Sequence, residues 1–264
     1  MQLKLKLTVA AAIACVAGMA SAQDTQVVKI GHVAPMSGGG AHLGKDNENG
    51  ARMAIEELNT QNIVIGGKKI RFEIAAEDDA SDPKQGTAVA QKLCDAKVAG
   101  VVGHLNSGTT IPASKVYNDC GIPHVTGAAT NPALTKPGYK TTYRIIANDN
   151  SLGAGLAFYA ADALKVKTVA VIDDRTAYGQ GVAEVFKKTA LTKGIKVVDE
   201  QFTTDKATDF MAILTAIKAK NPDAIFYGGM DPKLAQCCGR WSNLAWTKSS
   251  TSLVMESALP NYPS

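Results

Sequence analysis

Two short apolar runs, each followed by a loop of small and hydroxyl side chains, constrain this chain more than any other feature. The first run, Gly100–Gly103, leads through one histidine into LNSGTT, and the second, residues 122–125, leads into TGAAT. A helical pattern over residues 111–119 lies between them and stops at Gly121. Strands joined through a helix run parallel, so both loops are predicted to lie at the carboxyl ends of neighbouring strands, where open α/β sheets hold ligands.

The two loops predict a small ligand that carries a carboxylate group. The first N–H groups of a helix have no acceptor within the helix, and a helix N-terminus favours negative charge. Ser107 and Thr130 add hydroxyl groups beside these N–H groups. The alternative for each hydroxyl is a simple helix cap, and the residues alone leave both uses open.

The rest of the chain alternates strands and helices. Apolar, β-branched runs predict strands over residues 27–33, 69–76, 98–103, 122–125, 143–146, 168–172, 196–202 and 224–228. Amphipathic spacing predicts helices over residues 47–59, 83–94, 111–119, 152–164, 181–192 and 209–220. This order is typical of parallel sheets covered on both faces, and it divides into two runs near residues 144–150. The predicted fold class is therefore α/β, with two doubly wound parallel-sheet lobes.

Residues 1–22 have the pattern of a secretory signal peptide. Two lysines precede an apolar segment over residues 7–20 that is short for a membrane span, and Ala-Ser-Ala at its end fits a cleavage site. The mature chain is then expected to begin at Gln23. The alternatives are an ordinary N-terminal helix and a lipoprotein attached through Cys15, for which the preceding residues fit poorly.

Export would permit disulfide bonds. Cys94 and Cys120 both fall near the carboxyl ends of predicted helices, each shortly before a strand. Neighbouring helices on one face of a sheet would bring the two side chains together. The sequence leaves two possibilities open, a Cys94–Cys120 disulfide or two buried thiols.

Charge and motifs argue against several classes of function. The formal net charge is +4 and no basic cluster is larger than a short pair of lysines, so nothing suggests nucleic acid as a partner. The four histidines lack metal-ligand spacing, and the chain has no GxSxG elbow and no P-loop. We therefore expect a protein that is not an enzyme and uses no metal or cofactor. His104, beside the first loop, is expected to pack or cap rather than act as a base.

Several stretches carry a family resemblance that covers about residues 27–232. They are HLNSGTTIPAS, ATNPALT, APMSGGGAHLGKDNENGARMAIEELN, EDDASDPKQGTAVAQKL, DRTAYGQGV and DAIFYGGMDP. Together they resemble the periplasmic leucine/isoleucine/valine-binding proteins of ABC importers. The resemblance implies the type I periplasmic binding protein fold, whose lobes close around a hinge with a first crossing near residues 145–149. It also implies an amino-acid ligand such as leucine, isoleucine or valine, a periplasmic location, and an inner-membrane ABC permease as partner.

The resemblance also assigns ligand-binding residues in the first lobe. Ser107, Ala128 and Thr130 match carboxylate-binding positions. Ser107 and Thr130 would contribute hydroxyl and N–H groups, and Ala128 its main chain. Leu105 and Asn106 would line the pocket for the ligand side chain.

In the second lobe, Tyr178 matches an aromatic residue that would cover the ligand, with its ring face near the ammonium group. A tyrosine on a surface turn is the alternative. Met230 and Leu43 stand where some relatives carry aromatic residues, so the resemblance leaves the preferred ligand side chain open.

The sequence changes character after Leu234. Family members continue through a helix, a strand and a Gly-Asp-Gly or Gly-Glu-Gly loop whose acid binds the ligand ammonium, whereas residues 235–264 show no clear period. Permitted codons from Ala235 onward, read in another frame, yield a string similar to that continuation. We therefore expect a frameshift near Leu234, a C-terminally truncated family member and impaired binding. A natural variant tail is the alternative.

These expectations divide the chain into a signal peptide (residues 1–22), an N-terminal lobe (23–146), an incomplete second lobe (147–234) and an aberrant tail (235–264). The predicted function is capture of a branched-chain or related amino acid for an ABC importer. A receptor that senses amides or small carboxylates on the same fold is the alternative, although a signal peptide argues against a cytoplasmic sensor.

Overall fold

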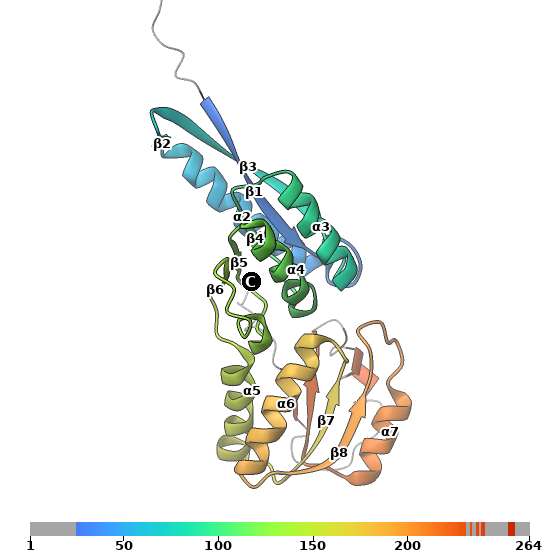
Figure 1. Ribbon diagram of the computed structural model, residues 1–264. Helices are drawn as coiled ribbons and strands as arrows, with labels where there is room; N and C mark the ends of the chain where they lie inside the picture. Colours follow the sequence, from blue (N-terminus) through green and yellow to red (C-terminus); the bar gives the residue numbers. More distant parts are fainter. Residues whose placement is uncertain (1–24, 231–232, 234–235, 238, 241–252, 257–264) are drawn as a thin grey trace, which may run out of the picture.

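The chain forms two lobes, each built on a β-sheet flanked by helices (Figure 1). The computed structural model describes residues 25–230, 233, 236–237, 239–240 and 253–256. The expected signal peptide, residues 1–22, and most of the expected tail, residues 235–264, lie outside the described residues. Within the described part, no helix combines the length and apolar character needed to cross a bilayer.

The first sheet has six strands in the order β2-β3-β1-β4-β5-β6. All neighbouring pairs are parallel except β2 and β3. The strands are β1 (Thr25–Ala34), β2 (Val64–Ile65), β3 (Lys68–Asp78), β4 (Gly100–Gly103), β5 (His124–Thr126) and β6 (Thr142–Arg144). The helices of this lobe are α2 (Ala41–Thr60), α3 (Pro83–Asp95), α4 (Ser107–Cys120) and the short 3-10 helix η1 (Pro132–Leu134).

The second sheet is parallel throughout and has the order β10-β9-β7-β8. Its strands are β7 (Thr168–Asp173), β8 (Lys196–Phe202), β9 (Ala224–Gly228) and β10 (Leu253–Glu256). Its helices are α5 (Asp149–Phe158), which continues as the π-helical turn η2 (Tyr159–Ala163), α6 (Ala177–Thr192) and α7 (Met211–Lys220). The chain leaves the first sheet at the end of β6 and enters the second lobe at the start of α5.

Successive residues of the second sheet pack against different helices, as expected for a sheet buried on both faces. Val171 and Phe226 lie in a core cluster with Phe186 of α6. Ile225, the neighbour of Phe226 in β9, lies in a separate cluster with Leu214 of α7. In Figure 1, α6 and α7 accordingly lie on either side of this sheet. The predicted doubly wound α/β architecture is confirmed.

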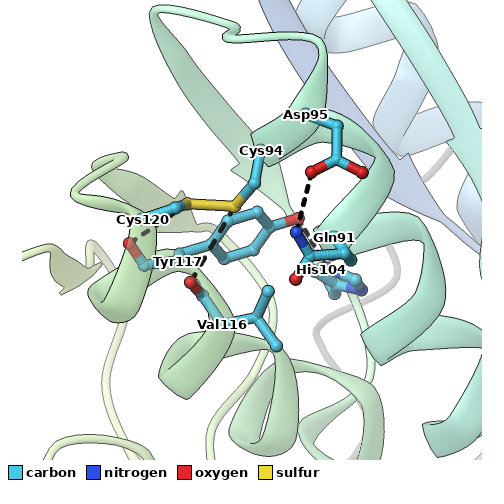
Figure 2. The surroundings of a disulfide bond; sticks show 7 residues. All are labelled: Gln91, Cys94, Asp95, His104, Val116, Tyr117 and Cys120. Atoms are coloured by element: carbon cyan, nitrogen blue, oxygen red, sulfur yellow. Dashed lines mark hydrogen bonds between the residues drawn. A yellow bond between two sulfur atoms is a disulfide. The ribbon is translucent and has the colours of Figure 1, made fainter.

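In the first lobe, α3 and α4 cover one face of the sheet. Leu93 of α3, Val101 of β4 and Tyr117 of α4 share one core cluster. Cys94 and Cys120 form a disulfide that joins the ends of α3 and α4, with the two Cα atoms 6.1 Å apart (Figure 2). Of the two possibilities that the sequence leaves open, the structure has the disulfide.

Several helices begin before the segments predicted from the sequence. The structure starts α2 at Ala41, α4 at Ser107 and α6 at Ala177, whereas apolar periodicity predicts residues 47, 111 and 181. The first turns consist mainly of small and polar residues without an apolar period, so a periodicity argument misses them. Two short strands, β2 and β10, also lack a periodic signal, and β10 pairs with β9 inside the segment for which the sequence predicts no element.

We expect Gly44→Ala to lower the free energy of unfolding by about 3 kcal/mol. α2 approaches the segment after β1 so closely that a Cβ atom at Gly44 would lie 1.8 Å from the carbonyl oxygen of Pro35. Because this oxygen belongs to the main chain, rotation of a side chain cannot relieve the clash. Chemical denaturation at neutral pH measures the change.

Gly50→Ala provides a matched control on the same helix. Gly50 is exposed, and apart from the adjoining backbone of its own helix no described atom lies within 4 Å of a Cβ built there. This substitution is expected to stabilise the protein by about 0.5–1 kcal/mol, because alanine favours the helix more than glycine does. Equal effects of the two substitutions would contradict the close approach at Gly44.

Candidate functional site

The two loops that the sequence points to meet at one edge of the first sheet. β4 and β5 are adjacent and parallel, so the loops at their carboxyl ends are neighbours. The main-chain N–H of Asn131 donates to Ser107 Oγ at 3.2 Å. This hydrogen bond connects the loop after β5 to the first turn of α4.

Ser107 is the first residue of α4, and the N-cap position belongs to Asn106. Its side chain is buried, and its Oγ accepts from Asn131 rather than capping its own helix. A hydroxyl oxygen that accepts one hydrogen bond still has its own O–H to donate. Ser107 can therefore donate to an anion held at the start of α4.

Asn106 and Leu105 precede this turn and differ in exposure. The Asn106 side chain is half-buried and does not cap α4, and its Oδ1 accepts from Ser81 Oγ at 3.2 Å. Leu105 is only 8% exposed. Leu105 therefore offers little surface to a ligand, whereas Asn106 offers more.

Thr126, the last residue of β5, connects the bases of the two loops. Its hydroxyl donates to the carbonyl oxygen of His104 at 2.8 Å. The main-chain N–H groups of Ala128 and Ala129 donate to the same Thr126 Oγ1, at 3.2 and 3.0 Å. Because the N–H of Ala128 is used in this way, its carbonyl is the main-chain group available to a ligand.

Thr130 lies at the end of the second loop and is 5% exposed. Its Oγ1 is buried and has no hydrogen-bond partner among the described residues. A buried hydroxyl without a partner is costly, and a ligand that bonds to it would remove that cost. Thr130 is thus the position in these loops that most clearly needs an external partner.

His104 is wholly buried in a polar network beneath the first loop. Its Nδ1 lies 2.9 Å from Asp79 Oδ2, and its Nε2 lies 3.0 Å from the hydroxyl of Tyr117. Figure 2 shows the Tyr117 ring beside the disulfide, with its hydroxyl directed at His104. His104 therefore packs and supports the loop, and both ring nitrogens already have partners.

The second lobe presents Tyr178 and Met230 at the carboxyl ends of its strands. Tyr178 lies in the first turn of α6, is half-buried and packs against the core cluster of its lobe. Thr176 caps this helix by accepting from the N–H of Gly179 at 3.0 Å. Met230 follows β9 closely and is also half-buried. Tyr178 is therefore not simply a tyrosine on a surface turn.

The second loop of the first lobe contacts the start of α6. The side-chain amide of Asn131 donates to the carbonyl oxygen of Ala177, the residue before Tyr178. A Cβ atom built at Gly181 would lie 2.5 Å from Asn131 Nδ2, so the absence of a side chain at this position allows the close approach. The loop that carries Thr130 and the turn that carries Tyr178 are therefore neighbours.

Two buried carboxylic acids lie close to these loops. Asp149 is the first residue of α5, and burial raises its pKa to about 6, while the Thr130 hydroxyl and Arg144 act to lower it. Asp174 follows β7, and its pKa is likewise raised by burial despite hydrogen bonds from Thr176. Both Asp149 oxygens and Asp174 Oδ2 lack a hydrogen-bond partner among the described residues. Acids with pKa values shifted by burial occur preferentially at functional sites.

The sequence patterns single out neither acid. Asp174 is the second of two acids that follow the strand predicted over residues 168–172, and polar residues at the end of a strand were the available signal. Asp149 lies in the crossing between the lobes, and its burial arises only from tertiary packing. Among the described residues, no group of three or more metal-ligating side chains is present.

A family model described as periplasmic binding protein matches residues 27–251. The chain is 38% identical over 229 residues to the leucine-, isoleucine-, valine-, threonine-, and alanine-binding protein of Pseudomonas aeruginosa. The aligned residues make up 87% of this chain and 60% of that protein. The chain is also 34% identical over 236 residues to the leucine-specific-binding protein of Salmonella typhimurium. Here the aligned residues make up 89% of this chain and 63% of that protein. The chain thus spans about three fifths of the length of these curated relatives.

Solved structures show the same fold. A leucine binding protein from Thermotoga maritima has a TM-score of 0.77 at 29% identity, over 83% of this chain and 61% of that one. A branched-chain amino acid transporter substrate binding protein from Streptococcus pneumoniae, in complex with isoleucine, has a TM-score of 0.76 at 27% identity. This match covers 83% of this chain and 62% of that one.

A third similar structure has a ligand of another class. It is a solute binding protein of an ABC transporter from Rhodopseudomonas palustris in complex with 3,4-dihydroxy benzoic acid, with a TM-score of 0.70 at 25% identity over 81% of this chain and 58% of that one. The family match covers most of the chain, and the similar structures share its fold. The chain therefore belongs to the periplasmic binding protein family.

Proposed function

We propose that this protein is an extracytoplasmic solute-binding protein that captures a branched-chain or related amino acid and delivers it to the inner-membrane permease of an ABC importer. The observation that carries the proposal is the pair of joined loops at the ends of β4 and β5, where Ser107 and the unpartnered hydroxyl of Thr130 come together. Relatives named for leucine, isoleucine and valine binding support the amino-acid class.

Binding would use the two ends of the amino acid separately. The carboxylate would accept from the hydroxyls of Ser107 and Thr130 and from N–H groups at the start of α4, which also favours negative charge. Ala128, which the family resemblance places among the carboxylate-binding positions, would instead accept from the ammonium group through its carbonyl, because its N–H already donates to Thr126 Oγ1. The ligand side chain would lie near Leu105 and Asn106, and the low exposure of Leu105 limits its contribution.

The second lobe would complete the site on closure. Tyr178 would cover the ligand with its ring near the ammonium, and Met230 would contact the ligand side chain. The Asn131–Ala177 contact supports this arrangement because it brings the first-lobe loop to the start of α6. The segment between β6 and α5 would serve as one hinge crossing, and the N-terminal leader would direct the protein to the periplasm.

A small aromatic carboxylate is the second candidate ligand. It is favoured by the similar Rhodopseudomonas palustris structure with a dihydroxybenzoate, and the same two loops would hold its carboxylate. A sensing receptor for amides or small carboxylates would use the same site. A benzoate lacks an ammonium group, so the two ligand classes differ in the need for an acceptor beside the carboxylate.

Thermal-shift measurements with the purified protein test the proposal. A panel of leucine, isoleucine, valine, small amides and 3,4-dihydroxybenzoate should contain at least one amino acid that raises Tm by about 5 °C or more at 100 times its Kd. Stabilisation by the benzoate alone would favour the second candidate. Stabilisation by none of these compounds, or turnover of any of them, would contradict the proposed function.

A further inference from the structure

Lysines gather at the edge of the second sheet where its strands begin, which we call the amino edge. Three segments reach this edge, residues 159–168 before β7, 189–197 before β8 and 216–224 before β9. Their acids are Asp162 and Asp223, and their six lysines are Lys165, Lys167, Lys193, Lys196, Lys218 and Lys220. The amino edge therefore carries a formal charge of +4, as much as the whole chain. Only the fold brings these lysines together, because they come from three separate segments.

The opposite edge of the same sheet has the reverse charge. The segments at the ends of β7 and β8, residues 173–176 and 203–210, contain four aspartates against Arg175 and Lys206. This edge faces the ligand loops of the first lobe, whereas the amino edge lies at the end of the second lobe farthest from the first lobe (Figure 1). The second lobe is thus polarised, with its positive end directed away from the candidate site.

Helix capping accounts for only part of the positive charge. A lysine in the last turn of a helix stabilises that helix through its dipole. Lys218 and Lys220 occupy the last turn of α7 in this way, but the last turns of α6 and η2 contain no basic residue. Lys165, Lys167 and Lys196 are exposed, and none of them forms an ion pair with another described residue. Their charge is therefore available to a partner.

Large apolar side chains are exposed beside these lysines. Tyr159, at the start of η2, is 52% exposed, and Leu191, in the last turn of α6, is 61% exposed. The ammonium group of Lys193 lies 4.7 Å from the centre of the exposed Phe158 ring and pairs with Asp162 at 3.0 Å. Lysines among exposed aromatic and aliphatic side chains are typical of surfaces that lie in the headgroup region of a bilayer.

We propose that the amino edge of the second sheet docks the protein on an anionic phospholipid membrane. The negative potential of such a membrane attracts lysines near its surface, and aromatic side chains occupy the layer between water and hydrocarbon. An acidic protein would also attract the lysines, but attraction of charge alone gives no reason to expose Tyr159 and Leu191. Docking through this edge would leave the loops after β4 and β5 accessible to a ligand, because they lie beyond the opposite edge. The inference goes beyond ligand capture and does not depend on it.

Vesicle sedimentation of the full chain is the first test. At about 50 mM salt, the wild type should bind phosphatidylcholine vesicles that contain about 30% phosphatidylglycerol. The triple variant Lys165→Gln, Lys167→Gln and Lys196→Gln should bind at least about tenfold more weakly, because each lysine near an anionic surface contributes up to about fivefold. This difference should disappear at about 0.5 M salt, where the charges are screened.

A second triple variant removes the same charge from the first lobe. Lys68, Lys84 and Lys97 are exposed and lie far from the amino edge in the sequence and on the other sheet's lobe. Their replacement by glutamine should weaken vesicle binding by less than about threefold. A larger effect would mean that net charge matters and position does not.

A tryptophan probe locates the contact. Tyr159 and Tyr143 are both 52% exposed, and Tyr143 lies in β6 of the first lobe. In otherwise unchanged chains, brominated phospholipid in the anionic vesicles should quench the fluorescence added by Tyr159→Trp and leave that added by Tyr143→Trp unchanged. Both proteins share residues 1–22, so any affinity of this apolar leader for lipid does not affect the comparison.

The results separate the proposal from its alternatives. Undiminished binding of the amino-edge lysine variant, an equal loss in the first-lobe variant, or equal quenching at the two tryptophan positions would overturn the inference. Binding of the wild type to poly-L-glutamate but not to anionic vesicles would overturn it in favour of an acidic protein partner. Failure to bind any amino acid would contradict the proposed function and leave membrane docking standing.

Discussion

The double substitution Ser107→Ala and Thr130→Ala is expected to weaken binding of the preferred amino acid by about 100-fold or more. Each hydroxyl is placed to donate to the ligand carboxylate, and a hydrogen bond to a charged group contributes about 1.5–3 kcal/mol. Two such losses correspond to about 3–6 kcal/mol, and every 1.4 kcal/mol is tenfold in Kd. Titration calorimetry on the purified protein measures the effect directly.

The control for this experiment must separate binding from folding. Removing the Ser107 hydroxyl also leaves the N–H of Asn131 without its acceptor, which costs stability. Thr130→Val avoids this problem because no main-chain N–H of the described part donates to Thr130 Oγ1. It should keep the Tm of the wild type or exceed it, and still weaken binding about tenfold.

A second pair of hydroxyls serves as a matched comparison. Thr87 and Thr192 donate only to carbonyl oxygens of their own helices, at 2.8 Å to Lys84 and 2.7 Å to Thr189. Their replacement by alanine should leave ligand affinity unchanged. If Thr130→Val binds as tightly as the wild type, the role assigned to Thr130 is wrong.

Reduction of the Cys94–Cys120 disulfide is expected to lower the free energy of unfolding by about 3.5 kcal/mol. The two cysteines are 26 residues apart in the sequence, and a cross-link that closes a loop of this length lowers the entropy of the unfolded chain by a corresponding amount. The bond also fixes the ends of α3 and α4 (Figure 2). The opposite end of α4 begins with Ser107. Denaturant titrations with and without a reducing agent measure the loss.

The double variant Cys94→Ala and Cys120→Ala is the control for reduction. Its midpoint should resemble that of the reduced wild type and should not change further when the reducing agent is added. A wild-type midpoint that is insensitive to complete reduction, verified by thiol counting, would contradict a stabilising role for this bond.

The fold follows from the sequence best where strands are buried on both faces. Residues 168–172 and 224–228 are predicted as strands and match β7 and β9 to within one residue. A continuous apolar run between turn residues identifies such strands without tertiary information. Helix starts are less accessible, because the first turns of α4 and α6 are rich in small and polar residues.

The candidate site depends more strongly on tertiary structure. Loop composition and strand order indicate that a ligand is held near Ser107 and Thr130, and the family resemblance assigns their roles. The unpartnered state of Thr130 Oγ1 and of the Asp149 carboxyl is visible only when the surrounding segments are in place. Asp149 lies near Thr130 because β6 returns the chain alongside β5, which no local pattern reports.

The most direct measurement compares an amino acid with its carboxamide. Whichever of leucine, isoleucine and valine gives the largest thermal shift should be titrated calorimetrically into the wild-type protein, beside the corresponding amide, which keeps the ammonium and the side chain but lacks the anionic carboxylate. If the joined loops after β4 and β5 hold the carboxylate, the acid should bind at least about 100-fold more tightly than the amide. Equal affinities, or no binding of any of the three acids, would contradict this account.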